Sequence, residues 1–180
     1  MNVRCPHCGG EHDLDALEPS LKRPDAYIAV PPAERDFRTM GSADACAVRS
    51  ADDQDRRYFL RVLLPFAVVG HEFPYSWGVW VEVSEEDYHR SHDLWDDPDQ
   101  ALKPPFPGRL ANSLHCYRNT LGLPGLVSRT GPKHVPHFHF VQGVDHPLAI
   151  AQRTAVPPEV AILWILPIYH PETFGKIDAA

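Results

Sequence analysis

The sequence predicts an α+β protein: a mainly antiparallel sheet with a few short helices packed on it, and an N-terminal turn of the zinc-knuckle kind. Apolar and polar residues alternate in two segments that are joined by a turn containing Gly and Pro. The 19 prolines favour short elements, because their share is about twice the usual 5%. A pair of cysteines spaced by two residues near the start indicates the knuckle.

The two alternating segments are residues 57–64 and 77–83, and each places its apolar side chains on one face of a strand. The turn at residues 70–74 lets the two strands pair as antiparallel neighbours. Ser84 then predicts a helix that runs to about Trp95, because its hydroxyl can cap free backbone N–H groups and three acidic residues follow it.

The remaining elements are predicted with less detail. Further strands are expected at residues 110–114, 126–129 and 135–141. A second helix is expected from Asp145, with Pro147 in its first turn. The apolar run at residues 160–166 is too short to separate helix from strand, and we expect it to be buried in either case.

Length and composition predict one domain. A chain of 180 residues, 43% hydrophobic, can bury one core. Its expected parts are a Cys/His knuckle at 1–16, an extended wrap at 17–56, a sheet and helix core at 57–155, and an apolar segment and tail at 156–180.

A net charge of -7 without a basic cluster argues against nucleic acid as a partner. No segment resembles a signal peptide or a membrane span, so we expect a cytoplasmic protein without a membrane partner.

The knuckle motif is Cys5-Pro6-His7-Cys8 followed by two glycines. In a reducing compartment, such a pair is more typical of metal ligands than of a disulfide. A tight turn can point both thiolates at one ion, and a structural zinc ion takes four ligands. His12 is the nearest third candidate, and the fourth is Cys46 or Cys116. The sequence therefore predicts one structural zinc ion.

The same motif allows a redox interpretation. Cys-Pro-His-Cys occurs in strongly oxidising members of the thioredoxin superfamily, in which a helix N-terminus stabilises the first thiolate. That chemistry needs a strand before the motif and a helix after it. Here four residues precede Cys5 and two glycines follow Cys8, so a thiol-disulfide oxidoreductase is kept only as an alternative.

A second possible metal site consists of His134, His137 and His139. On a strand, His137 and His139 project to the same side, and three ligands with an open position can build a catalytic zinc site. This pattern gives the alternative of a metal-dependent hydrolase. The competing interpretation, which we favour, is that these histidines face solvent on a strand whose Phe138 and Phe140 face the core.

A possible binding surface lies on the second face of the two long strands. Alternation places Trp80 on the face opposite Trp77, and Arg61 of the neighbouring strand can share that face. Trp80 either packs beneath the helix that follows these strands or lies in an exposed groove. In the second case Trp80 and Arg61 form an aromatic and arginine patch of the kind common at recognition surfaces.

Several motifs spread over most of the chain belong together. They are Cys5, Cys8, Gly9 and His12; Asp44 and Cys46; Phe59-Leu60-Arg61; Trp77-Gly78-Val79-Trp80-Val81 with Ser84-Glu85-Glu86; Tyr117 with Thr120-Leu121; and Asp145-His146-Pro147-Leu148 with Gln152. As a set, they resemble a bacterial family known as domain of unknown function 2199.

The resemblance implies that Cys5, Cys8, His12 and Cys46 form one metal site. It implies no activity, because the family has none assigned, and neither Cys116 nor the three histidines belong to its pattern. The segment after Val156 lies outside that pattern as well. The combined hypothesis is a zinc-stabilised binding or interaction module without catalytic activity, in which the zinc-tied turn holds residues 18–37 against the sheet.

Overall fold

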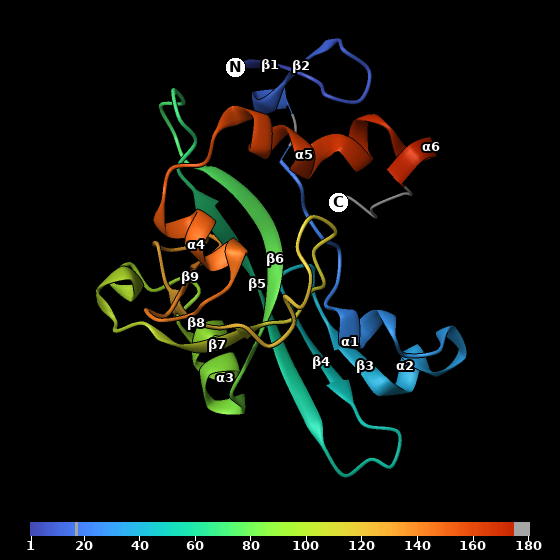
Figure 1. Ribbon diagram of the computed structural model, residues 1–180. Coiled ribbons are helices and arrows are strands. Elements are labelled where there is room, and N and C mark those ends of the chain that lie inside the picture. The colour runs from blue at the N-terminus through green and yellow to red at the C-terminus, as the bar shows by residue number, and fades with distance from the viewer. Residues whose placement is uncertain (17, 175–180) are drawn as a thin grey trace.

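The computed structural model describes residues 1–16 and 18–174, so the end of the expected C-terminal tail lies outside the described residues. The strands are β1 (Asn2–Arg4), β2 (Glu11–Asp13), β3 (Thr39–Gly41), β4 (Ala45–Arg49), β5 (Arg56–Phe66), β6 (Tyr75–Val83), β7 (Phe106–Leu110), β8 (Pro124–Ser128) and β9 (His137–Phe140). The α-helices are α1 (Asp25–Ile28), α2 (Arg35–Arg38), α3 (Glu85–Asp93), α4 (Pro147–Arg153), α5 (Pro158–Tyr169) and α6 (Pro171–Phe174), shown in Figure 1. Short 3-10 turns lie at Leu14–Ala16, Pro32–Glu34 and Gln100–Leu102.

The main sheet is antiparallel between sequential neighbours and closes on itself. Its strand order is β3-β4-β5-β6-β7-β8-β9. A parallel contact between Leu63 and His137 pairs β5 with β9, so that β5 to β9 form a closed barrel from which β3 and β4 extend. The α+β class and the mainly antiparallel sheet are confirmed. The sequence did not predict that the sheet closes into a barrel. Alternation within a strand does not specify which distant strand edges pair.

The predicted pair of long strands is present as β5 and β6, in register from Tyr58 opposite Val83 to Phe66 opposite Tyr75. The side chains on the two faces of this strand pair belong to two different buried clusters. The face with Leu60, Val62 and Val79 contributes to the large core, whereas Phe59 and Trp80 belong to a smaller cluster on the other side. Both faces of the ribbon are therefore covered.

The helix predicted at Ser84 is α3, and the Ser84 hydroxyl accepts a hydrogen bond from the backbone N–H of Asp87 at 3.1 Å. The second predicted helix begins two residues later than expected, because the His146 ring, not the Asp145 carboxylate, caps it by accepting from Leu148 N–H. The apolar run at residues 160–166 is helical and belongs to α5. The strand expected at residues 110–114 lies earlier, as β7, and ends where that segment begins.

The N-terminal wrap crosses β6 at Gly78. Gly78 N–H donates to Pro19 O at 2.9 Å, and Leu21 N–H donates to Gly78 O at 2.8 Å. A Cβ atom at Gly78 would lie only 2.4 Å from the Ser20 hydroxyl oxygen, so a larger residue here would displace the Ser20 side chain. The wrap is thus attached to the sheet by its own backbone hydrogen bonds.

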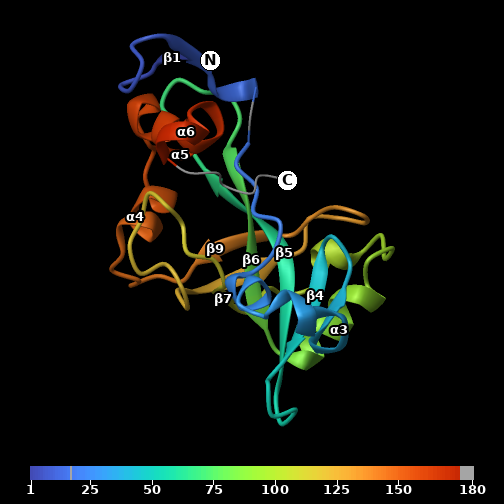
Figure 2. The same cartoon turned by 90° about the vertical axis from the view of Figure 1, so that its right-hand side faces the viewer.

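The N-terminal hairpin and the helices α5 and α6 meet at one end of the barrel (Figures 1 and 2). Figures 1 and 2 both show the β1 and β2 hairpin beside α5 and α6. Helix α5 docks through Trp164, which is 1% exposed and packs against Phe66, Tyr75 and Trp77. This docking places the C-terminal end of α5 next to the hairpin loop. None of the described helices combines the length and the apolar character needed to cross a membrane.

Candidate metal centre

The knuckle is the loop of the β1 and β2 hairpin. Cys5 N–H donates to Gly10 O at 2.7 Å and Gly9 N–H donates to Cys5 O at 3.0 Å, which closes a tight turn between the two cysteines. Gly9 has a φ of 74°, a left-handed conformation that favours glycine. Gly10 N–H points at the Cys8 sulfur at 3.4 Å, so a backbone donor faces a thiolate position. The local sequence alone therefore brings both sulfurs to one side of the turn.

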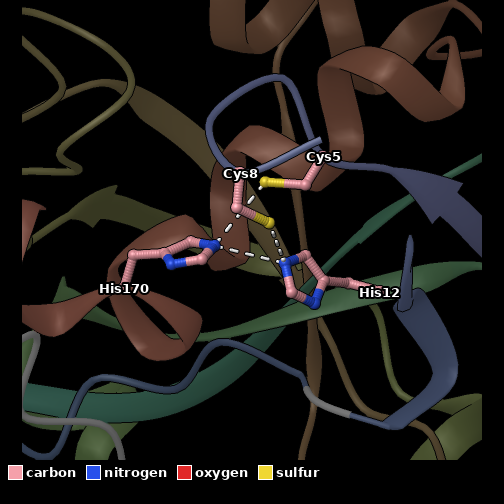
Figure 3. A group of neighbouring side chains, drawn as sticks. All are labelled: Cys5, Cys8, His12 and His170. Atoms are coloured by element: carbon pink, nitrogen blue, oxygen red, sulfur yellow. Dashed lines mark hydrogen bonds between the residues drawn. The ribbon is translucent and has the colours of Figure 1, made fainter. Parts of the chain in front are cut away.

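His12, the middle residue of strand β2, brings a third potential ligand close to the two cysteines. Its Nε2 atom lies 3.5 Å from the Cys8 Sγ atom. The flat face of its ring stacks on Tyr169 of α5, with ring centroids 4.1 Å apart and an interplanar angle of 17°. The stacking holds the imidazole so that Nε2 points toward the sulfurs, as Figure 3 shows.

The fourth member is His170, which lies between α5 and α6. The residue that precedes a proline is disfavoured in helical conformation, and His170 precedes Pro171; its φ of -131° and ψ of 58° lie outside the helix. Its Nε2 atom lies 3.6 Å from Cys5 Sγ and 3.2 Å from His12 Nε2. The side chain is only 14% exposed, so it is turned inward toward the knuckle.

The four donor atoms lie close enough together to hold one metal ion. All of them lie within 4.8 Å of one another. A zinc ion with Zn–S bonds of about 2.3 Å and Zn–N bonds of about 2.0–2.1 Å separates a sulfur from a nitrogen by roughly 3.5 Å, and two nitrogens by roughly 3.3 Å. The observed separations of 3.5, 3.6 and 3.2 Å match these values. Two sulfurs and two imidazole nitrogens are also ligands that zinc prefers.

The cysteines of the chain differ in how readily they ionise. Desolvation raises the pKa of Cys5, but the backbone N–H groups of Cys8 and His7 and the Cys8 thiol together outweigh it, and the net pKa is lowered. Burial raises the pKa of Cys46 to about 12, against the opposing charge of Arg23. Burial likewise raises the pKa of Cys116 to about 12. Thiolate character, which metal binding requires, is thus favoured at Cys5 and disfavoured at Cys46 and Cys116.

The comparison with protein families agrees with the motif set. Residues 4–156 match a family described as an uncharacterized protein conserved in bacteria (DUF2199). The chain belongs to this family. Searches of the curated proteins and of the solved structures found no match. Cys5, Cys8 and His12 fall within the DUF2199 segment, whereas His170 lies beyond it.

The fourth ligand expected from the sequence, Cys46, is placed elsewhere. It lies on β4, has no exposed surface and packs with Phe59 and Trp80 in the smaller cluster. Among the described residues, the group of potential ligands contains His170 in the place expected for Cys46. Cys116 lies near the Leu163 carbonyl, 3.3 Å away, and is not part of the group either. Three of these four residues therefore lie within the DUF2199 segment, and the fourth, His170, directly follows α5.

Sequence reasoning missed His170 because nothing in its neighbourhood resembles a ligand motif. It follows an apolar helix and precedes a proline, which is the ordinary signal of a helix end. Between Cys5 and His170 lie 165 positions along the chain, so only the docking of α5 brings them together.

The predicted binding surface of Trp80 and Arg61 is not formed as expected, because Trp80 is buried whereas Arg61 is half-buried. Trp80 has no accessible surface, and its indole N–H donates to Leu21 O of the wrap at 2.9 Å. Arg61 does share this face, directly opposite Trp80, but it forms an ion pair with Asp44 at 3.2 Å and donates to the Ser20 hydroxyl at 2.9 Å. The groove is closed because the wrap covers it.

The three histidines of the alternative site are arranged as the solvent-facing interpretation expects. Phe138 and Phe140 are buried, whereas His139 is exposed and His137 is half-buried. The rings of His137 and His139 lie 6.3 Å apart, edge to face, and His134 is held by the Pro132 carbonyl at 2.9 Å. Within the described residues, no group of potential metal ligands includes these histidines.

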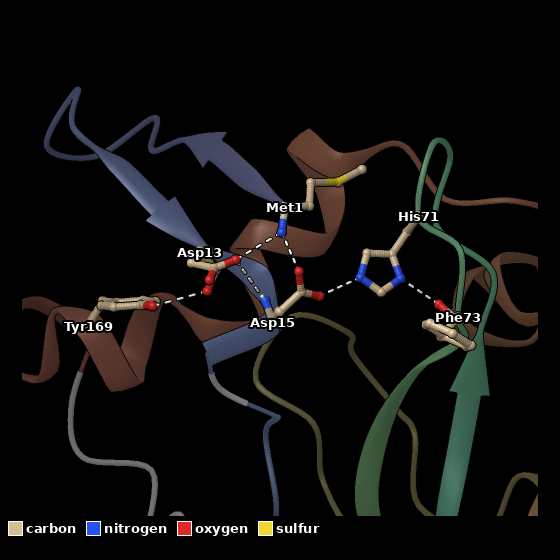
Figure 4. A network of polar contacts seen from close by, with 6 residues as sticks. All are labelled: Met1, Asp13, Asp15, His71, Phe73 and Tyr169. Carbon is tan, nitrogen blue, oxygen red and sulfur yellow. Dashed lines mark hydrogen bonds and ion pairs between the residues drawn. The ribbon is translucent and has the colours of Figure 1, made fainter.

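A second set of contacts fastens the hairpin next to the metal centre, as Figure 4 shows. The Nε2 atom of His71, in the loop between β5 and β6, contacts the Asp15 carboxylate, and its Nδ1 atom contacts Phe73 O. Both ring nitrogens face acceptors, so the protonated imidazolium satisfies both contacts. Tyr169 adds a hydrogen bond from its hydroxyl to Asp13 O at 3.1 Å.

This network predicts a pH-dependent stability. The Asp15 carboxylate first, and then Phe73 O, raise the pKa of His71 above 6.5, so its contribution is complete below about pH 6.5 and is lost as the pH rises through the higher folded value. The Met1 amino group first, and then His71, lower the pKa of Asp15 below 3.8, so its contribution is lost only as the pH falls below that value.

We therefore expect His71→Gln to lower the melting temperature more at about pH 5.5 than at about pH 9, with a difference in unfolding free energy of up to about 1 kcal/mol. The matched control is His92→Gln, because the His92 side chain is 86% exposed. An equal effect of His71→Gln at both pH values would contradict the prediction.

Proposed function

We propose that this protein is a zinc-stabilised binding module without catalytic activity, in which one structural zinc ion joins the N-terminal hairpin to the C-terminal helices. The observation that carries the proposal is the convergence of Cys5, Cys8, His12 and His170 within 4.8 Å. Catalytic zinc sites keep one position for water or substrate, whereas structural sites use four protein ligands. Four protein donors therefore support a structural role.

The contacts of the hairpin support this role. Val3, Cys5 and Leu14 are the buried hydrophobic residues of 1–16, and of these only Val3 and Leu14 belong to the large core, so the hairpin has little hydrophobic area with which to hold itself in place. Metal coordination contributes folding free energy directly, because the ligands do not form a site in the unfolded chain. A metal ion at this point would fasten the hairpin to α5 and α6. The wrap at residues 18–37, which we expected the zinc to hold, is attached by its own bonds to β6.

The proposal is tested by metal analysis of the purified protein. We expect about one zinc ion per chain, and an X-ray absorption spectrum with two sulfur and two imidazole ligands. The variant His170→Cys provides a sharper measurement, because it should keep the zinc ion and change the ligand set to three sulfurs and one nitrogen. A protein that binds no zinc after reconstitution, or a spectrum of His170→Cys identical to that of the parent, would overturn the proposal.

A further inference from the structure

A cavity of about 400 Å³ lies at the edge of the barrel, away from the metal centre. It is bounded by the end of α3, by β4 and β5, and by the segment that leads into β9. This volume falls in the range of pockets that hold small organic ligands. Leu60, Tyr88, Trp95, Val135 and Pro136 contribute apolar and aromatic surface to its wall, beside polar and charged side chains.

Arg129 places a buried positive charge in the wall of this cavity. Its residue is only 9% exposed, and desolvation lowers its pKa, which shows that burial disfavours the charge. An arginine side chain nevertheless stays protonated in proteins. Its Nε atom is buried and has no hydrogen-bond partner, and its Nη2 atom reaches the Ser91 hydroxyl only at 3.4 Å. Two donor groups of this side chain are therefore poorly satisfied.

The neighbouring charges only partly stabilise Arg129: burial first, and then the charge of Arg90, lower its pKa, and the charge of Asp87 offsets only part of this lowering. In the described part of the chain, no carboxylate forms an ion pair with it; Asp44 pairs with Arg61 at 3.2 Å, and Asp96 with Lys133 at 3.6 Å. The guanidinium lies over the Phe106 ring, 4.5 Å from its centroid. Such a contact offsets part of the cost of burial, but it offers no acceptor oxygen. A buried guanidinium without an anion is unfavourable, because no ion pair offsets the free energy of removing the charge from water.

We propose that this cavity binds a small organic monocarboxylate, whose carboxylate contacts Arg129 and whose apolar body lies against Trp95 and Tyr88. A planar carboxylate accepts parallel N–H donors from a guanidinium. Asp44 and Asp96 also line the cavity, but Asp44 is paired with Arg61 and Asp96 with Lys133, which leaves the single charge of Arg129 for a ligand with one negative group. The inference deepens the proposed binding role, on which it rests, but it does not depend on the zinc ion.

The experiment titrates the full-length protein with phenylacetate, hexanoate, phenylacetamide and inorganic phosphate, and follows binding by calorimetry and tryptophan fluorescence. We expect at least one of the two carboxylates to bind with a 1:1 stoichiometry and to change the fluorescence of Trp95, and the neutral amide and phosphate not to bind. Hydrogen bonds to charged groups contribute about 1.5–3 kcal/mol, so Arg129→Met should weaken carboxylate binding by roughly 10- to 100-fold. The exposed Arg153 provides the control variant Arg153→Met, which should bind as the parent does.

A second measurement does not depend on the choice of ligand. Because an uncompensated buried charge is removed, Arg129→Met should melt at the same temperature as the parent or higher in the absence of carboxylate. The inference is overturned if Arg129→Met is strongly destabilised, if both carboxylates fail to bind, or if the amide or phosphate binds as well as they do. Zinc content measured on the same samples separates a failure of this inference from a failure of the metal centre.

Discussion

The variant His170→Ala is expected to lose stoichiometric zinc, whereas Cys46→Ala is expected to retain it. His170 supplies one of the four converging donor atoms, and Cys46 lies in a separate buried cluster. Loss of even an outer partner of a metal site costs about 10- to 100-fold in affinity, so loss of a direct ligand should weaken zinc binding by at least about 100-fold. The measurement is a competition titration with a chromophoric chelator.

The effect on stability separates the two variants further. A chelator should lower the melting temperature of the parent and of Cys46→Ala, and should leave that of His170→Ala almost unchanged, because that variant has no zinc to lose. Cys46→Ala is a suitable control, since the side chain is fully buried and the substitution removes only one sulfur atom from the small cluster. If Cys46→Ala lost zinc and His170→Ala kept it, the assignment of the fourth ligand would be wrong.

Trp164→Ala is expected to destabilise the protein by about 3–5 kcal/mol, the range measured for removal of large buried aromatic side chains. The ring is 1% exposed and touches Phe66, Tyr75 and Trp77, which belong to the two long strands. Its removal leaves a cavity between α5 and the barrel. Urea unfolding followed by circular dichroism measures the change in free energy.

The adjacent residue provides the control for this prediction. Leu163 is on the same helix and is 38% exposed, so Leu163→Ala should cost less than about 1 kcal/mol. Both variants are compared in the presence of excess chelator, so that the metal contributes nothing to the difference. A cost for Trp164→Ala no larger than that for Leu163→Ala would mean that α5 unfolds separately from the barrel.

Local patterns predicted those features whose causes are local. Alternation identified β5 and β6 and the face that each buries, because successive side chains of a strand point to opposite sides. Ser84 identified the start of α3, because a cap acts on the N–H groups of the first helical turn. Cys5 and Cys8 were identified together for the same reason: a tight turn within six residues brings their sulfurs to one side.

Other features depended on which segment covers which face. Alternation correctly placed Trp80 on the face opposite Trp77, but the burial of that face is decided by the wrap, whose Leu21 carbonyl accepts the indole N–H. Arg129 carried no signal in the sequence. Its isolation from carboxylates becomes visible only where α3, β5 and the segment before β9 surround it.

The sequence by itself determined the class of the fold, the long strand pair, the capped helix and three members of the metal centre. The tertiary structure decided the closure of the barrel and the fourth member, His170. Periodicity, caps and turns act over a few residues, whereas His12 and His170 are separated by 158 positions and meet only because Trp164 seats α5 on the core. Contacts between residues so far apart in the sequence depend on the packing of the whole chain, and short sequence motifs do not predict them.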